Sequence, residues 1–73
     1  MNLKERVGLN IQETRRAKGL SQETLADAAD LSRSYMGKLE NARNAMSLDA
    51  LERIAVALSV DPQELLRPRN TRT

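Results

Sequence analysis

Residues 19–41 read GLSQETLADAADLSRSYMGKLEN and carry two short helical patterns with very little chain between them. Ser21 precedes the first pattern as a candidate N-cap, because its hydroxyl can accept a hydrogen bond from the first exposed amides of a helix. Asp30 interrupts this pattern, and Ser32 offers a second N-cap. We therefore expect two helices, over about residues 22–29 and 33–41.

The connection between these two helices consists only of Asp30, Leu31 and the cap Ser32. A connection this short forces a steep crossing, which is the geometry of a helix-turn-helix motif. Ala26 is small at the point where the two helices would approach most closely. The apolar underside that they would share comprises Leu25, Ala29, Leu31, Met36 and Leu39. In such a motif the second helix can enter a DNA major groove, which is about 12 Å wide.

The opposite side of the second helix is polar and carries no acid before Glu40; it consists of Arg33, Ser34, Gly37 and Lys38. Arginine can form two hydrogen bonds with O6 and N7 of guanine, lysine can reach guanine or a phosphate, and serine can bond to either. The same residues would suit an ordinary solvated helix face. The helix-turn-helix spacing favours contact with phosphates and base edges.

Upstream of the motif, Leu3, Val7 and Ile11 recur every four residues. This spacing predicts a helix over about residues 3–18 with one narrow apolar stripe. Gly19 follows at once, and a glycine there can adopt the left-handed conformation that ends a helix.

Downstream of the motif, residues 41–46 have no period and two asparagines, so we expect a loop. Ser47 is the next candidate N-cap, and a helix is expected to follow it through about Leu58. The single apolar face of this helix is expected to comprise Leu48, Leu51, Ile54, Ala55 and Leu58.

A fifth, short helix is indicated by residues 61–64, DPQE, which combine a cap Asp, a Pro in the first turn and a Glu three residues after the cap. This helix would carry Leu65 and Leu66 and end before Pro68. No β-alternation of useful length occurs in the sequence. The expected fold class is all-α, a compact five-helix bundle.

The composition excludes most kinds of catalytic and metal site. The 73 residues include 12 Lys and Arg against 10 Asp and Glu, with no His, Cys or Trp. Zinc sites of Cys and His, disulfides, and nucleophiles that depend on Cys or on a Ser–His pair are therefore excluded. Paired carboxylates could still perform acid-base chemistry, but no candidate pair stands out. We expect a binding protein that is not an enzyme and has no cofactor, catalytic residue or metal ion.

Charge is unevenly distributed along the chain. Residues 1–66 carry nine basic and ten acidic groups, whereas residues 67–73 hold Arg67, Arg69 and Arg72 and no acid. Affinity for a polyanion must therefore come from where the charges lie, because the net charge is only +2. We expect residues 1–66 to form one helix-turn-helix DNA-binding domain with a C-terminal dimerisation helix. Residues 67–73 are expected to be a disordered basic tail, either a solvated end or a phosphate-binding arm.

Two further expectations concern the surroundings of the chain. A domain of this size buries only about 60% of the surface that its unfolded form exposes, so a partner subunit is expected. No apolar stretch approaches the roughly 20 residues of a membrane span, and the N-terminus lacks the apolar run of a signal peptide. We therefore expect a cytoplasmic protein with no membrane partner.

Residues 19–23 and 39–41 resemble the Cro and phage-repressor-like helix-turn-helix family, also called XRE-type regulators. The resemblance extends from about Val7 to Leu66 and includes the Ser-x-x-x-Leu-x-x-Ile-Ala-x-Ala-Leu pattern of residues 47–58. It implies a five-helix, lambda-repressor-like DNA-binding domain that acts in transcription, usually as a homodimer. Gly37, the loop residues Arg43 and Asn44 and the short chain are similar to restriction-modification controller proteins within this family.

The resemblance also implies roles for single residues. The DNA-binding set that it implies comprises Gln22, Ser32, Arg33, Ser34, Tyr35, Lys38, Asn41 and Arg43. Arg15 and Glu40 match a family pair in which an arginine of the first helix meets the glutamate that closes the recognition helix. Asp30 stands where glycine is usual, so a left-handed conformation there would carry some strain.

These features favour a homodimeric, sequence-specific regulator of transcription that places two recognition helices about 34 Å apart on a pseudo-palindromic operator. The dimer interface is assigned to Val60, Leu65 and Leu66. Expected partners are double-stranded DNA, a second copy of the chain and, as a further candidate, RNA polymerase. The expected setting is a bacterial cytoplasm, with association to the nucleoid and an origin in a bacterium or a phage. The alternative is an antitoxin-like protein-interaction module in which DNA binding is secondary.

Overall fold

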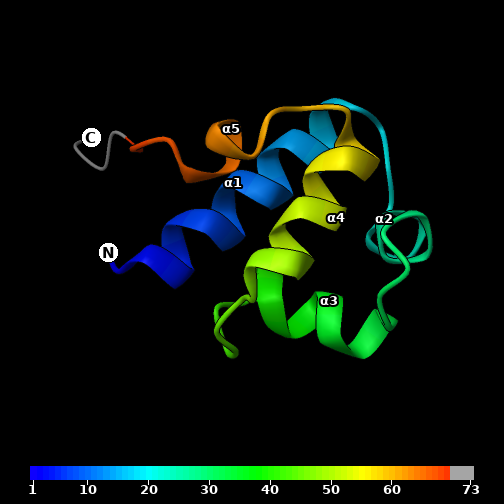
Figure 1. Ribbon diagram of the computed structural model, residues 1–73, viewed down its shortest axis with the longest axis horizontal. Helices are drawn as coiled ribbons and strands as arrows, with labels where there is room; N and C mark the ends of the chain where they lie inside the picture. The colour runs from blue at the N-terminus through cyan, green and yellow to red at the C-terminus, as the bar shows by residue number, and fades with distance from the viewer. Residues whose placement is uncertain (70–73) are drawn as a thin grey trace.

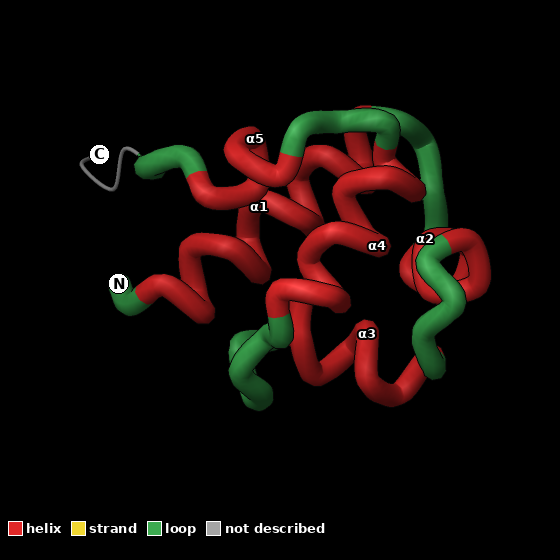
Figure 2. The backbone as a smooth tube through the Cα atoms, in the orientation of Figure 1, coloured by secondary structure: helices red, strands yellow, loops and turns green. Residues whose placement is uncertain are grey.

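Five helices make up most of residues 1–69, the part of the chain that the computed structural model describes (Figures 1 and 2). They are α1 (Leu3–Ala17), α2 (Gln22–Ala28), α3 (Arg33–Glu40), α4 (Leu48–Leu58) and α5 (Pro62–Leu66). No strand occurs within residues 1–69. The expected all-α, five-helix fold is confirmed, and each helix lies where the sequence pattern predicts it. None of the described helices is long and apolar enough to cross a membrane.

Each helix begins at a polar residue whose side chain caps it. The hydroxyls of Ser21, Ser32 and Ser47 each accept a hydrogen bond of 3.0 Å from the backbone N–H three residues further on. Asn2 accepts from the N–H of Glu5 at the start of α1, and Asp61 accepts from the N–H of Gln63, two residues on, at the start of α5. Since such a cap contributes about 1 kcal/mol to helix stability, the start of each helix is determined locally.

Two residues in the left-handed conformation separate the first three helices. Gly19 has a φ of 73° after α1, and Asp30 has a φ of 57° after α2. Both conformations agree with the sequence expectation. The backbone N–H of Leu31 donates to the carbonyl of Ala26 at 2.9 Å, which closes the end of α2 and directs the chain into α3. The short turn of the helix-turn-helix therefore forms with a non-glycine residue at its strained position.

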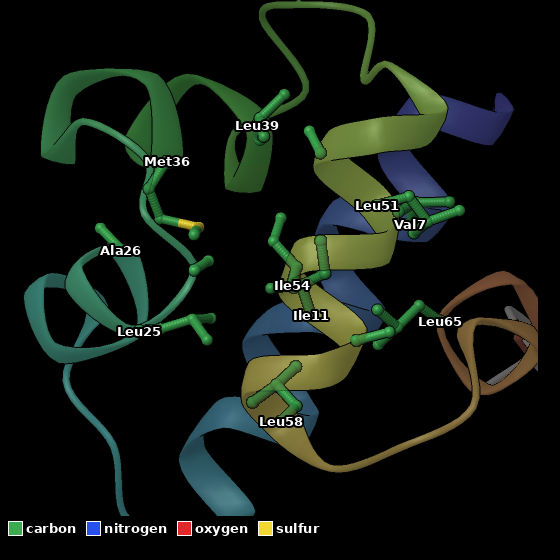
Figure 3. Close-up of a cluster of buried hydrophobic side chains, with 13 residues drawn as sticks. Val7, Ile11, Leu25, Ala26, Met36, Leu39, Leu51, Ile54, Leu58 and Leu65 are labelled. Atoms are coloured by element: carbon green, nitrogen blue, oxygen red, sulfur yellow. The ribbon is translucent and has the colours of Figure 1, made fainter.

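The core is shared by all five helices. Figure 3 shows side chains of α2 and α3, among them Leu25 and Met36, pointing toward those of α1 and α4. The fully buried large apolar residues are Ile11, Leu25, Met36, Leu39, Ile54, Leu58 and Leu65. The sequence placed Leu48 on the buried face of α4, but this residue is 84% exposed. It is the first residue of α4 and lies at the rim of an open groove, beyond the packed part of the helix.

Gly8 lets α1 lie directly against the C-terminal end of α3. A Cβ atom at this position would lie 2.8 Å from the carbonyl oxygen of Glu40 and 2.9 Å from that of Leu39. Real Cβ atoms essentially never approach backbone atoms so closely. The approach of α1 to α3 therefore depends on the missing side chain of Gly8.

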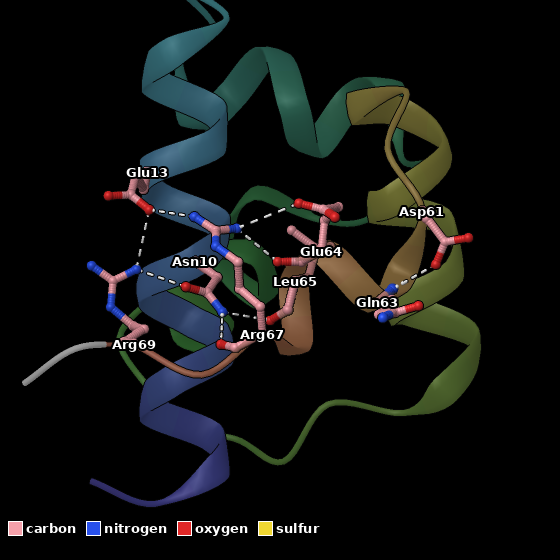
Figure 4. A network of polar contacts seen from close by, with 8 residues as sticks. All are labelled: Asn10, Glu13, Asp61, Gln63, Glu64, Leu65, Arg67 and Arg69. Atoms are coloured by element: carbon pink, nitrogen blue, oxygen red, sulfur yellow. Dashed lines mark hydrogen bonds and ion pairs between the residues drawn. The ribbon is translucent and has the colours of Figure 1, made fainter.

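Polar contacts connect the end of α5 to α1 (Figure 4). Asn10 is fully buried; its Nδ2 donates to the carbonyls of Leu65 at 2.9 Å and Arg67 at 3.0 Å, and its Oδ1 accepts from Arg69 at 2.7 Å. Glu13 pairs with Arg67 at 2.7 Å and with Arg69 at 3.3 Å. Within the expected basic tail, residues 67–69 thus contact α1. Arg72, the third arginine of that tail, lies outside the described residues, and the division of the chain at residue 66 stays a prediction.

The two helical glycines give a matched test of the α1–α3 contact. We expect Gly8→Ala to cost roughly 1–3 kcal/mol of unfolding free energy, because the new methyl group forces two backbones apart. We expect Gly37→Ala to stabilise the fold by about 0.5–1 kcal/mol, because alanine favours a helix and its Cβ would meet only the Oε1 of Gln22, at an ordinary 3.5 Å. Urea unfolding of both variants measures the difference. Equal effects of the two substitutions would contradict the close approach at Gly8.

Candidate nucleic-acid interface

The C-terminal end of α3 is held by a buried ion pair between Arg15 and Glu40. The Nε of Arg15 lies 2.8 Å from one carboxylate oxygen of Glu40, and Nη2 lies 3.0 Å from the other. Nη1 of the same arginine donates to the carbonyl of Leu20 at 3.0 Å. Arg15 therefore joins α1 both to α3 and to the segment that leads into α2. The ion pair that the family resemblance implies is present.

Gln22 and Gln12 complete the hydrogen bonds around Glu40. Nε2 of Gln22 donates to a carboxylate oxygen of Glu40 at 3.1 Å, and Nε2 of Gln12 donates to the backbone carbonyl of Glu40 at 2.8 Å. The sequence assigned Gln22 to DNA, whereas its half-buried side chain also links α2 to α3. The contribution of Gln12 was not foreseen, because nothing in the spacing of α1 marks it as a partner of a residue 28 positions away.

One side of α3 is open to solvent along the length of the helix. In Figure 1 this helix lies along the lower border of the bundle, and its first residues follow directly from α2. The exposed residues are Ser32, Arg33, Ser34 and Lys38. Tyr35 is half-buried and packs against the core. The exposed side of α3 thus carries two cations and no acid of its own, and it is available to a partner.

Three residues of the expected DNA-binding set lie just outside the two ends of α3. The hydroxyl of Ser32 accepts from the backbone N–H of Tyr35 at 3.0 Å, so Ser32 serves first as a cap. Asn41 is the C-cap of α3, and the backbone N–H of Arg43 donates to the carbonyl of Lys38 at 2.8 Å. The side chains of Asn41 and Arg43 are exposed at the end of α3 opposite to Arg33. Exposed cations thus occur at both ends of the same helix.

Arg33 has an acidic neighbour that the sequence did not reveal. Its Nη2 lies 3.1 Å from Oδ2 of Asp27 in the last turn of α2, and the two side chains are 65% and 62% exposed. The hydrogen bond that Arg33 donates to Asp27 raises the pKa of Arg33, and the negative charges of Asp27 and Glu23 raise it further. The pair spans six positions across the turn, a separation that helical periodicity does not connect.

The three residues assigned to a dimer interface differ in exposure. Leu65 is completely buried in the core of its own chain, so its side chain has no surface left for a second copy. Val60 and Leu66 are half-buried and pack against the same core. An open apolar groove lies nearby between α1, the loop before α4, and α5. Its lining comprises Leu3, Lys4, Val7, Ala45, Met46, Leu48, Leu51 and Leu66.

Known proteins are similar to this chain in both sequence and fold. Residues 4–67 match the model of a family described as a helix-turn-helix domain. Control protein C.BamHI of Bacillus amyloliquefaciens is 38% identical over 66 residues, which cover 89% of this chain and 82% of that protein. The crystal structure of the restriction-modification controller protein C.AhdI from Aeromonas hydrophila is similar at a TM-score of 0.83 and 44% identity, over 85% of this chain and 94% of that one.

A further solved structure contains DNA. It is the tetramer of the restriction-modification controller protein C.Esp1396I in complex with its natural 35 base-pair operator. The TM-score is 0.79 at 28% identity, over 92% of this chain and 99% of that chain. The likeness extends over nearly all of the described bundle and is not limited to the two helices of the motif.

The buried ion pair makes a prediction about stability. We expect Glu40→Ala to cost about 3–5 kcal/mol of unfolding free energy, because it leaves the guanidinium of Arg15 buried without its counter-charge. The double variant Arg15→Met/Glu40→Leu should cost less, since it removes both charges and keeps much of the volume. Urea unfolding compares the two. If the double variant is the less stable, the penalty does not come from an unpaired charge.

Proposed function

The chain belongs to the helix-turn-helix domain family, and from this premise we propose that it is a sequence-specific, DNA-binding regulator of transcription that acts as a homodimer. The observation that carries the proposal is the exposed side of α3, which presents Arg33, Ser34 and Lys38 while the other side of α3 is fixed in the core. An α-helix held in this way can enter the major groove without reorganising.

Each exposed residue of α3 has a contact that suits its chemistry. Arg33 pairs with O6 and N7 of a guanine, Lys38 reaches a guanine or a phosphate, and Ser34 bonds to a base edge or a phosphate. The remaining members of the set contact the phosphate backbone. They are Gln22, Ser32, Tyr35, Asn41 and Arg43. One N–H of the Gln22 side-chain amide donates to Glu40, so its second N–H is the donor left for a phosphate.

The second copy of the chain covers the apolar groove beside α4. Leu48 contributes most to this proposal, because a leucine that is 84% exposed at the rim of an apolar groove loses much apolar surface on association. Leu66 lines the same groove, and Val60 lies in the connection that leads into α5. A two-fold interface of this kind places two recognition helices in successive major grooves. The assembly of C.Esp1396I on its operator supports an oligomer on DNA.

The genes under control are those of a restriction-modification system. The similarity to C.BamHI and C.AhdI supports this assignment. Binding beside its own promoter would activate transcription at one occupancy, through contact with RNA polymerase, and repress it at a higher one. Regulation of this kind delays expression of the nuclease relative to expression of its methyltransferase. The function is binding in the cytoplasm, at the nucleoid, without a cofactor or a catalytic step.

Selection of bound fragments from a library of random duplexes tests whether the exposed side of α3 recognises a DNA sequence. We expect the parent protein to enrich a two-fold sequence with half-sites about one helical turn apart. Arg33→Ala should cost roughly 1–3 kcal/mol in binding and relax the preference at one base pair of each half-site. Arg43→Ala, the control, should weaken binding to all sequences alike and reduce the dependence of affinity on salt.

Two results would contradict this proposal. One is a parent protein that enriches no sequence, and the other is an Arg33→Ala variant that weakens all duplexes equally. An antitoxin-like module would instead still bind its protein partner when Arg33 and Lys38 are both replaced by alanine.

The groove makes a separate prediction about assembly. We expect Leu48→Glu to weaken the homodimer about tenfold or more, since it places a charge in an apolar contact. The fold should survive, because a glutamate in the first turn of a helix is favourable. Val56→Glu is the matched control, for Val56 is 72% exposed on the same helix and does not line the groove. Sedimentation equilibrium measures both; an equal loss in the two variants would argue against this groove as the interface.

A further inference from the structure

The turn of the helix-turn-helix brings an acid to the arginine that is proposed to read a base. Asp27 lies in the last turn of α2, and Arg33 is the first residue of α3. Oδ2 of Asp27 lies 3.1 Å from Nη2 of Arg33. An acid beside a DNA-binding cation would repel phosphates, so it weakens the general attraction that every duplex exerts. Its presence at this position calls for a compensating role.

We propose that Asp27 is a positioning residue that determines sequence specificity, since its carboxylate orients the guanidinium of Arg33 toward one base and away from phosphates. This inference rests on the proposed function and names a determinant of the same site. It assigns a role in recognition to a residue of α2 that does not belong to the expected DNA-binding set.

The geometry leaves the arginine able to read a base while it is held. The contact occupies one N–H of Nη2, and the planar guanidinium has five N–H donors. Two adjacent donors therefore remain for O6 and N7 of guanine. A long arginine side chain that is 65% exposed otherwise samples many rotamers, and the carboxylate reduces the conformational freedom that is lost on binding.

The charge of Asp27 has a second effect. A guanidinium that leaves Asp27 for a phosphate exchanges one anion for another and gains little, whereas one that stays gains the guanine contact in addition. Asp27 raises the pKa of Arg33, which agrees with an attraction between the carboxylate and the guanidinium. Asp27 therefore lowers affinity for an arbitrary duplex and preserves affinity for a matching one, which is a gain in specificity.

Folding does not explain the pair. Both side chains are mostly exposed, and ion pairs of that kind contribute little to stability. Glu23 provides a matched control on the same helix, because its charge also acts on Arg33 but no hydrogen bond joins the two. A comparison of Asp27 with Glu23 separates the hydrogen-bonded contact from the charge alone.

The experiment applies the random-duplex selection to the parent protein, Asp27→Ala, Glu23→Ala and Asp27→Ala/Arg33→Ala. We expect Asp27→Ala to reduce discrimination about tenfold at the same base pair that Arg33→Ala relaxes, while affinity for unselected duplex rises. Glu23→Ala should raise affinity for unselected duplex and keep the parent preference. The double variant should show the same base-pair preferences as Arg33→Ala alone, because Asp27 acts only through Arg33.

Two outcomes would overturn the inference alone: an Asp27→Ala profile equal to that of the parent, or an equal relaxation by Glu23→Ala. In both cases the parent would still select its operator, and Arg33→Ala would still relax one base pair. A parent protein that selects no sequence would instead overturn the proposed function, and the role of Asp27 with it. Unfolding in urea checks that the Asp27→Ala and Glu23→Ala variants retain the stability of the parent protein.

Discussion

The buried carboxylate of Glu40 is the constraint around which the other helices are arranged. A carboxylate removed from water is strongly unfavourable unless its oxygens receive hydrogen bonds, and the C-terminal end of a helix is the less favourable end for a negative charge. Glu40 is satisfied by Nε and Nη2 of Arg15 from α1 and by Nε2 of Gln22 from α2. We infer that this requirement fixes where α1 and α2 meet α3, because a shifted helix would leave a buried charge without its donors.

The same constraint explains how an eight-residue helix can serve two purposes. Its C-terminal half supplies Leu39 and Glu40 to the interior, and Gly8 allows the backbone of α1 to approach it directly. Met36 adds a fully buried side chain from the first half of the helix, so α3 is held along its whole buried side. The exposed side is then free to carry Arg33 and Lys38 in a defined direction, which is what a base-reading side chain requires.

Local chemistry made most of the fold predictable from the sequence. The caps Ser21, Ser32 and Ser47, the glycine at residue 19 and the aspartate at residue 30 act through their own backbone neighbours, so their effects can be read without knowing the fold. The Arg15–Glu40 pair was accessible only through the resemblance to a family, since 25 residues separate its members. Asp27, Gly8 and the buried Asn10 were missed because each acts on a partner that only the tertiary fold brings near.

The apolar residues show where such reasoning reaches its limit. Periodicity identifies a side chain that avoids water, but it does not say whether the chain itself or a second copy will cover it. The sequence analysis assigned Leu48 to the core and Leu65 to an interface, whereas Leu48 is 84% exposed and Leu65 is completely buried. The cause is the path of α5, whose end is fastened to α1 by Asn10 and so folds Leu65 inward, while the first turn of α4 extends past the core. Because that path depends on hydrogen bonds between residues 55 or more positions apart, the assignment of apolar surface to core or partner had to wait for the tertiary structure.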